Sequence, residues 1–429
     1  MDGLPSPALS RRGFVKAAVA LGGASALSAC LAREAPDLPT GPDDLSSLPD
    51  RQHAWNAALS TDAHGNDVAP RHHVLLLLDY AGSGEPTEAD RETTERALQS
   101  LERAYPRRHD GEVGLLFTVG YSPAYFERFD DALPGSVDLQ EPRALAPFED
   151  PELDRPDAVV HLASDYGSVV LAAEAALLGE RDELNGREVA TNLDGVFDLA
   201  DRRTGFVGAG LPADHQDVAG IPDSGPVADD APLYMGFKSG FSKNQATEER
   251  ITIQDGPFAD GTTQQLSLLR LHLEQWYDQD SRHHRVATMF CPAHADEGLV
   301  EGTGENLGDT SLMEERGCPA HAGRDARESG VVGHSQKSAR AREDGSPIIL
   351  RRDFDSTHGG EASLHFLSLQ RRVEDFVKTR EAMNGTDLAG GAVGQRQNNG
   401  ILQYVTVERR GNYLVPPRRL RSLPPARPT

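Results

Sequence analysis

The 429-residue sequence is poor in lysine, in cysteine and in long apolar runs. Only five of its 43 basic residues are lysines, and the formal net charge is −24. So acidic a surface argues against nucleic acid and anionic membrane surfaces as partners, because both carry dense negative charge. The composition resembles that of proteins from salt-loving organisms, in which carboxylates keep the surface hydrated.

The longest apolar stretch near the N-terminus, Ala17–Ala29, is too short for a permanent transmembrane helix. It follows the pair Arg11 and Arg12 and ends at Cys30. Paired arginines, an apolar region and small residues before a cysteine resemble a twin-arginine (Tat) export signal with a lipobox. We therefore expect residues 1–30 to direct export and Cys30 to carry a lipid at the outer face of the cytoplasmic membrane. The alternative is an ordinary amphipathic helix.

The elements expected in the first half alternate between strand and helix. Apolar runs predict strands, and apolar residues at helical spacing predict helices. The strands are expected over His72–Tyr80, Gly111–Tyr121 and Asp157–Ser164, and the helices over Thr87–Ala104 and Ser168–Glu180. A β-α-β order followed by a second one is typical of the ferredoxin-like, split βαβ motif.

A weaker version of the pattern recurs in the second half. Thr262–Leu273 and Ser363–Gln370 are expected strands, and Arg371–Asn384 is an expected helix. The prediction is an α+β fold of two ferredoxin-like halves with antiparallel sheets. The halves are expected over residues 71–240 and 241–429, after an acidic, proline-rich linker over 31–70.

Seven stretches, in this order, resemble segments of the dye-decolourising (DyP-type) haem peroxidases. They are LLFTVGYSPAYFERF (115–129), DAVVHLASDYGSVVLAAEAALL (157–178), MGFKSG (235–240), DGPFADGTTQQLSLLRLHLEQWY (255–277), GHSQKSAR (333–340), PIILRRDFDS (347–356) and SLHFLSLQRRVEDFV (363–377). The resemblance rests on their order and spacing more than on any one of them. It is closest to the Tat-exported deferrochelatase/peroxidase branch, of which this chain looks like a divergent, haloarchaeal-like member. Relatives in that family often form dimers or larger rings, so a homo-oligomer is an expectation of the resemblance alone.

The resemblance implies a haem b between the two halves. His334 matches the iron ligand, and Arg351, 17 residues later, matches the arginine above the opposite haem face. An arginine there stabilises the charge that develops as the O–O bond of hydrogen peroxide breaks. The neighbouring Arg352 leaves this register open by one residue. Gly236 and Gly240 match the glycines of a loop along the haem.

Two positions depart from the family pattern. Ser239 stands where the glycine loop of the family carries an acid, and serine has no pKa near neutrality with which to carry a proton. Three other acids remain as alternatives for that role: Asp255, Asp260 and Asp353. Gln403 stands where a carboxylate is expected to contact the iron-binding histidine.

A tetrapeptide that the resemblance does not explain occurs twice. The sequence C-P-A-H begins at Cys291 and again at Cys318, which places His294 and His321 three residues after each cysteine. A disulfide between the two cysteines is the favoured interpretation for an exported protein. The alternative is a four-ligand zinc or copper site, since thiolate and imidazole suit both metals. Two further alternatives remain. The cysteines are free thiols, or one of these histidines replaces His334 as the haem ligand.

The sequence thus predicts an exported, lipid-anchored, DyP-like haem protein. Its expected activity is a peroxide-dependent oxidation tied to iron or haem handling. Ser239 occupies the position at which the family carries its catalytic acid. The second hypothesis is a non-catalytic surface lipoprotein of the same fold that binds haem, a metal or no cofactor.

Overall fold

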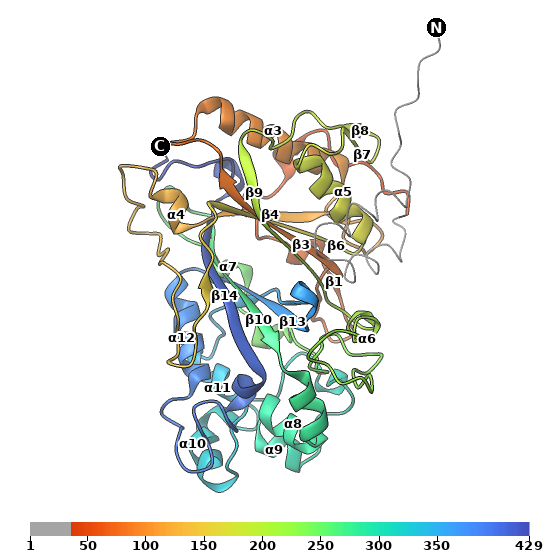
Figure 1. Cartoon of the computed structure of the whole chain (residues 1–429), viewed down its shortest axis with the longest axis vertical. Coiled ribbons are helices and arrows are strands. Elements are labelled where there is room, and N and C mark those ends of the chain that lie inside the picture. Colours follow the sequence, from red (N-terminus) through yellow and green to blue (C-terminus); the bar gives the residue numbers. More distant parts are fainter. Residues whose placement is uncertain (1–35, 429) are drawn as a thin grey trace.

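The computed structural model describes residues 36–428 (Figure 1). The predicted export signal and Cys30 lie outside the described residues. Within residues 36–428, every helix is too short or too polar to cross a membrane.

The first half forms a four-stranded antiparallel sheet in the order β9-β3-β6-β4. Helices α3 and α5 each join two strands that are not neighbours in the sheet, as in a split βαβ unit. The elements are β3 (His72–Tyr80), α3 (Glu88–Ala104), β4 (Leu116–Tyr121), α4 (Pro123–Phe126), β5 (Glu152–Leu153), β6 (Ala158–Ser164), α5 (Gly167–Leu177), β7 (Glu183–Leu184), β8 (Arg187–Glu188), β9 (Phe197–Phe206) and α6 (Leu211–Asp214).

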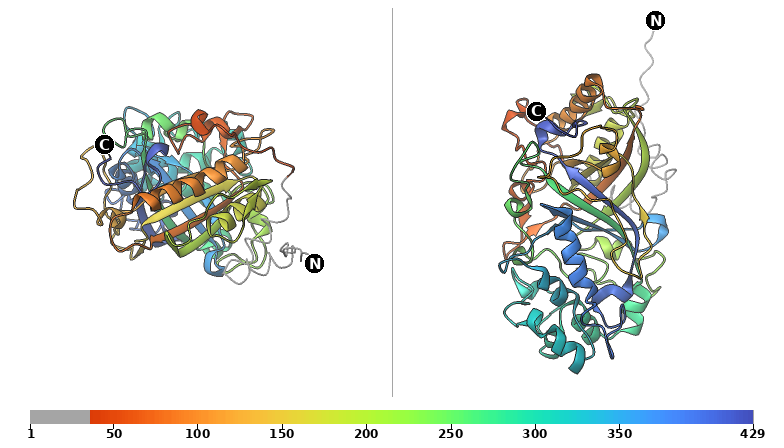
Figure 2. Two further views of the ribbon diagram at one scale, coloured as in Figure 1. Left: turned by 90° about the horizontal axis from the view of Figure 1, so that it is seen from above. Right: turned by 90° about the vertical axis from the view of Figure 1, so that its left-hand side faces the viewer.

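Local sequence accounts for the first of these elements. The run HHVLLLLDY is buried on both faces of β3, except at Asp79. Thr87 then starts α3, because its hydroxyl accepts the backbone N–H of Asp90, and the Asp90 carboxylate accepts the backbone N–H of Thr87 in return. Leu98 and Leu101 place the apolar face of α3 on the outer side of the sheet, beside α5 (Figure 2).

The second half repeats the arrangement, in the order β12-β13-β10-β14. Its helices fill the two long connections between strands. The elements are α7 (Glu248–Ile251), β10 (Thr262–Leu271), a π-helical turn (Gln275–Gln279), α8 (Arg282–Met289), α9 (Pro292–Asp296), α10 (Cys318–Glu328), α11 (His334–Ser338), β11 (Leu350–Arg351), β12 (Phe354–Ser356), β13 (Ser363–Gln370), α12 (Val373–Asn384) and β14 (Val405–Val415).

The two sheets join at both edges into one continuous sheet. Asp355 of β12 pairs with Phe206 of β9, and Leu414 of β14 pairs with Tyr121 of β4. Leucines of β3, β10 and β13 pack between the inner faces, and the helices of each half cover the outer faces. The predicted α+β fold with two ferredoxin-like, antiparallel halves is confirmed. The predicted boundary at residue 240 falls between the two sheets.

Two long strands, β9 and β14, went unpredicted because charges interrupt their apolar pattern. β9 contains Arg202 and Arg203, and the structure pairs both. Arg203 is completely buried and makes two hydrogen bonds to the Asp154 carboxylate, of 2.6 and 2.8 Å, while Arg202 pairs with Glu174. β14 likewise contains a buried arginine, Arg410.

The expected linker over 31–70 is corrected by the structure, because its described part is packed on the fold. Short strands β1 (Ser60–Thr61) and β2 (Asp67–Val68) pair with each other. Trp55 is completely buried, and the amide of Gln52 donates to the carbonyl oxygens of Val119 and Pro416. A polar composition misled the prediction, since a few apolar residues suffice to anchor a segment.

Breaking the buried pair in β9 should destabilise the protein strongly. Arg203→Met leaves the Asp154 carboxylate buried with only Arg409, 3.5 Å away, and should lower the free energy of unfolding by roughly 3 kcal/mol. Urea unfolding followed by tryptophan fluorescence measures this. The matched control is Arg187→Met, whose exposed pair with Asp43 should contribute less than about 1 kcal/mol. Equal losses in the two variants would contradict the prediction.

Candidate functional site

A cavity of about 220 Å³ lies between the outer face of the second sheet and helices α11 and α12. Alternate residues of the strands face it, because successive side chains of a strand point to opposite faces. Leu269 of β10 and Phe366 of β13 line the cavity, whereas Leu266 and Leu367 face the core between the sheets. Most of the lining surface is apolar, but charged side chains also line the cavity: Lys238, Arg342, Arg351, Arg380, Arg410, Asp353 and Asp355.

His334, the first residue of α11, reaches into the cavity. Burial, and next the charge of Arg351, lower the pKa of His334 to about 3, so its imidazole is neutral at physiological pH. Among the described residues, no protein group hydrogen-bonds to this imidazole. A neutral imidazole facing an apolar cavity is the form that binds a metal ion.

The position of α11 is set by the residues around His334. A side chain at Gly333 would overlap the carbonyl oxygen of Phe290, so only glycine allows this close approach. The buried side chain of Gln336 then joins three segments. Its amide nitrogen donates to the Cys318 carbonyl (2.8 Å) and the Asp325 carboxylate (2.7 Å), and its amide oxygen accepts the Gly333 N–H (3.0 Å).

Arg351 and Asp353 line the cavity on the strand side. Their charged groups lie 3.7 Å apart. Arg352 points the other way, where it stacks on Trp55 and contacts Glu248 at 3.1 Å. Strand alternation thus resolves the register that the sequence left open: Arg351 lines the cavity and Arg352 does not.

Two acids, the half-buried Asp353 and the buried Asp355, lie in the same wall. Burial raises the pKa of Asp353 to about 6, despite the opposing effect of Arg351 and a hydrogen bond from the Leu367 N–H. Burial also raises the pKa of Asp355 strongly, and Asp355 accepts a 2.6 Å hydrogen bond from the Tyr234 N–H. An acid with a pKa near neutrality can both take up and release a proton.

The MGFKSG loop forms another part of the wall. Gly236 has φ +76°, and a side chain there would lie 2.9 Å from the Tyr277 hydroxyl. Ser239 lines the cavity, as Met235 and Phe237 do, while Gly240 ends the turn with φ +78°. The glycines therefore allow the loop to turn, and Ser239 faces the same space as His334, Arg351 and Asp353.

Three predicted or alternative residues lie elsewhere. Asp260 pairs with Arg51, and Asp255 is exposed; neither lines the cavity. Gln403 accepts a hydrogen bond from the Asn398 N–H, so the expected contact with the histidine is not made. Of the three alternative acids, only Asp353 reaches the site.

Residues 70–417 match a protein family of unknown function, DUF7405. The chain belongs to this family. Among curated proteins, none matches it in sequence.

Several solved structures similar to this DUF7405 protein are DyP-type peroxidases. A putative one from Shewanella oneidensis gives a TM-score of 0.55 at 13% identity, over 82% of this chain and 94% of that chain. The encapsulated enzyme from Mycobacterium smegmatis gives 0.54 at 14%, over 86% and 100%. A DypB variant from Rhodococcus jostii RHA1 in complex with heme gives 0.54 at 15%, over 86% and 97%. At these identities the likeness establishes the fold alone.

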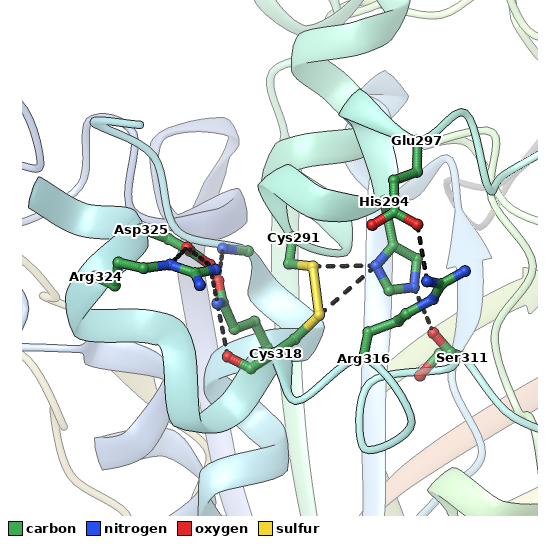
Figure 3. Close-up of a disulfide and its surroundings, with 10 residues drawn as sticks. Cys291, His294, Glu297, Ser311, Arg316, Cys318, Arg324 and Asp325 are labelled. Carbon is green, nitrogen blue, oxygen red and sulfur yellow. Dashed lines mark hydrogen bonds and ion pairs between the residues drawn. A yellow bond between two sulfur atoms is a disulfide. The ribbon is translucent and has the colours of Figure 1, made fainter. Parts of the chain in front are cut away.

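The two C-P-A-H units of this DUF7405 protein meet beside the cavity, between α9 and α10 (Figure 3). Cys291 and Cys318 form a disulfide, in agreement with the favoured interpretation. His294 Nδ1 lies 3.0 Å from the sulfur of Cys291 and 3.7 Å from that of Cys318. The alternative of a four-ligand site is not assembled, because in residues 36–428 the cluster holds these three groups and leaves out His321.

Sequence reasoning missed Gln336 and Asp355 as parts of the site. Gln336 carries no motif that marks it, and only the folded chain shows what its amide reaches. Asp355 lies four residues after Arg351, in a stretch already singled out, so the alternation of β11 and β12 could have indicated it.

The raised pKa of Asp353 predicts a pH-dependent penalty on stability. Its carboxyl has an ordinary pKa of 3.8 when unfolded and about 6 when folded, so the folded state loses stability as pH rises through 6. Asp353→Asn should therefore be more stable than the native protein at pH 8 by about 2 to 3 kcal/mol, with no gain at pH 4. Urea unfolding at both pH values tests this, with the surface variant Asp255→Asn as control. A difference that does not change between pH 4 and pH 8 would contradict it.

Proposed function

We propose that this protein is a DyP-like haem-binding protein that catalyses peroxide-dependent oxidation, in the context of iron or haem handling. One observation carries the proposal: a single apolar cavity brings together neutral His334, Arg351 and Asp353. The residues fit a haem, since the cavity is mostly apolar and His334 offers an imidazole that no described protein group occupies. The structural likeness to DyP-type peroxidases supports it at the level of the fold.

Each side chain has a role in that chemistry. When bound, a haem supplies an iron centre at which peroxide is reduced and organic donors are oxidised. His334 would hold the iron from the side of α11. Arg351 keeps its charge at any physiological pH and donates hydrogen bonds to peroxide oxygens. Asp353 is placed to take a proton from one peroxide oxygen and return it to the other.

In this proposal Asp353 is the proton carrier, a role that the family resemblance assigns to an acid at the position of Ser239. It lies beside Arg351, and its pKa of about 6 suits proton transfer near neutrality. Ser239 remains in the wall of the cavity, where its hydroxyl can orient peroxide or water through hydrogen bonds.

We also propose that the chain is exported through the Tat pathway and anchored through a lipid on Cys30. The support is the order of Arg11, Arg12, the apolar stretch and Cys30 in the sequence. The acidic, lysine-poor composition supports a salt-loving source.

A haem titration tests the proposed cofactor. The purified protein should give a sharp Soret band with one haem per chain, and His334→Ala should lose it, because no other imidazole in residues 36–428 lines the cavity. The control is His283→Ala, whose ring lies on the surface and pairs with Asp296. A normal band in His334→Ala, or no band in the folded native protein, would rule out this haem site.

Peroxide turnover separates Asp353 from Ser239 as the proton carrier. Asp353→Asn should keep the Soret band and lower the rate of peroxide consumption by roughly 10²- to 10⁴-fold, the usual contribution of general acid–base catalysis. Ser239→Asp should change the rate little, because the proton carrier is already present. A large rise in Ser239→Asp, with no loss in Asp353→Asn, would assign the proton to the glycine loop instead.

One observation favours a non-catalytic haem-binding lipoprotein as the second candidate. Within the described residues, no carboxylate contacts His334, so the ligand would lack the anionic character that favours oxidised iron. Haem binding without peroxide turnover in the native protein would establish this candidate.

A further inference from the structure

The cluster of Cys291, His294 and Cys318 is not used by the proposed haem chemistry. Cys291 immediately precedes α9, and Cys318 is the first residue of α10. One donor atom from each of the three residues lies within 4.8 Å of the others, and each residue is at most 1% exposed. A disulfide alone needs no imidazole at its side, so the place of His294 requires an explanation.

Hydrogen bonding defines the tautomer of His294. Its Nε2 lies 2.8 Å from the Ser311 carbonyl oxygen, which can only accept, so Nε2 carries the hydrogen. The other nitrogen, Nδ1, therefore presents a lone pair, and this lone pair faces both sulfurs (Figure 3). Burial lowers the pKa of His294, which keeps the ring neutral.

The oxidised cluster leaves that lone pair without a donor, because disulfide sulfurs carry no hydrogen. The reduced cluster offers two thiolates and one imidazole nitrogen that converge on one point. A backbone carbonyl that fixes the far nitrogen of a histidine is also the usual support of a metal-binding imidazole. We propose that the dithiol form of this cluster binds one monovalent copper ion through the sulfurs of Cys291 and Cys318 and Nδ1 of His294.

The number and softness of the donors favour monovalent copper over zinc. A buried structural zinc site has four protein ligands, whereas thiolates select monovalent copper. In residues 36–428 the cluster has three ligands. The nearby acids have other partners: Asp325 accepts from Gln336 at 2.7 Å, and Glu297 pairs with Arg316 at 2.8 Å.

Copper binding requires two steps, reduction of the disulfide and coordination of the ion. A small dithiol reductant supplies two electrons and two protons, which convert the disulfide into two thiols while the reductant becomes a disulfide. Binding of one copper(I) ion then releases two protons, because the ligands are thiolates. The copper(I) ion and its two thiolates carry one net negative charge. The positive charge of Arg316 lies close enough to interact electrostatically with the ligand His294. The disulfide form holds no thiolate, so copper binding follows the redox state.

The experiment uses the full chain without haem, so its outcome does not depend on the proposed function. The protein is first reduced with dithiothreitol, and the dithiothreitol is then removed under anaerobic conditions. The reduced protein is titrated with copper(I) in complex with the chelator bicinchoninate. The reduced protein should withdraw one copper ion per chain from the chelator, and the oxidised protein should withdraw none. No copper uptake by the reduced, folded protein would overturn the proposal.

Variants assign the ligands. Cys291→Ser and Cys318→Ser should each abolish uptake, and His294→Gln should weaken it at least about tenfold while both thiols remain. His294→Gln can still form the disulfide, so circular dichroism of its oxidised form checks the fold. His321→Gln is the matched control and should bind as the native protein does. Equal losses in His321→Gln and His294→Gln, or displacement of the copper by an equimolar amount of zinc, would overturn the assignment.

Discussion

The pairing of Asp355 with Phe206 holds one edge of the second sheet against the first, and the wall of the cavity depends on it. Asp355 lies at this seam, and its carboxylate also accepts the Tyr234 N–H at the start of the glycine loop. The loop that carries Ser239 and the strand segment that carries Arg351 and Asp353 therefore meet at one place. Two sheets that closed differently would separate these groups, although each half would still be a ferredoxin-like unit.

The buried titratable groups of the site lower the stability of the folded protein. Burial pushes His334 towards its neutral form and raises the pKa of Asp353 and of Asp355. An apolar cavity lined by such groups weakens stability, since each would prefer water when charged. Perturbed pKa values of this kind gather at functional sites, where proton transfer near neutrality or binding to a metal makes use of them.

Much of the fold could be predicted, and the reasons are local. The apolar run of β3 and the cap at Thr87 act over a few residues, so their patterns are legible in the sequence. β9 was missed because Arg203 looks exposed until Asp154, 49 residues away in the chain, is known to neutralise it. The segment around Trp55 was missed for the same kind of reason, because its partners, Val119 and Pro416, are distant in sequence.

The sequence alone determined the chemical groups available to the site: one histidine and one arginine at the expected spacing, a serine in the glycine loop, and two C-P-A-H units. Tertiary structure decided which of them meet. It placed Arg351 rather than Arg352 in the cavity, chose Asp353 among three acids, and left His321 out of the cysteine cluster. The physical reason is that strand alternation and sheet closure set the direction of each side chain, and closure depends on contacts between residues far apart in the chain.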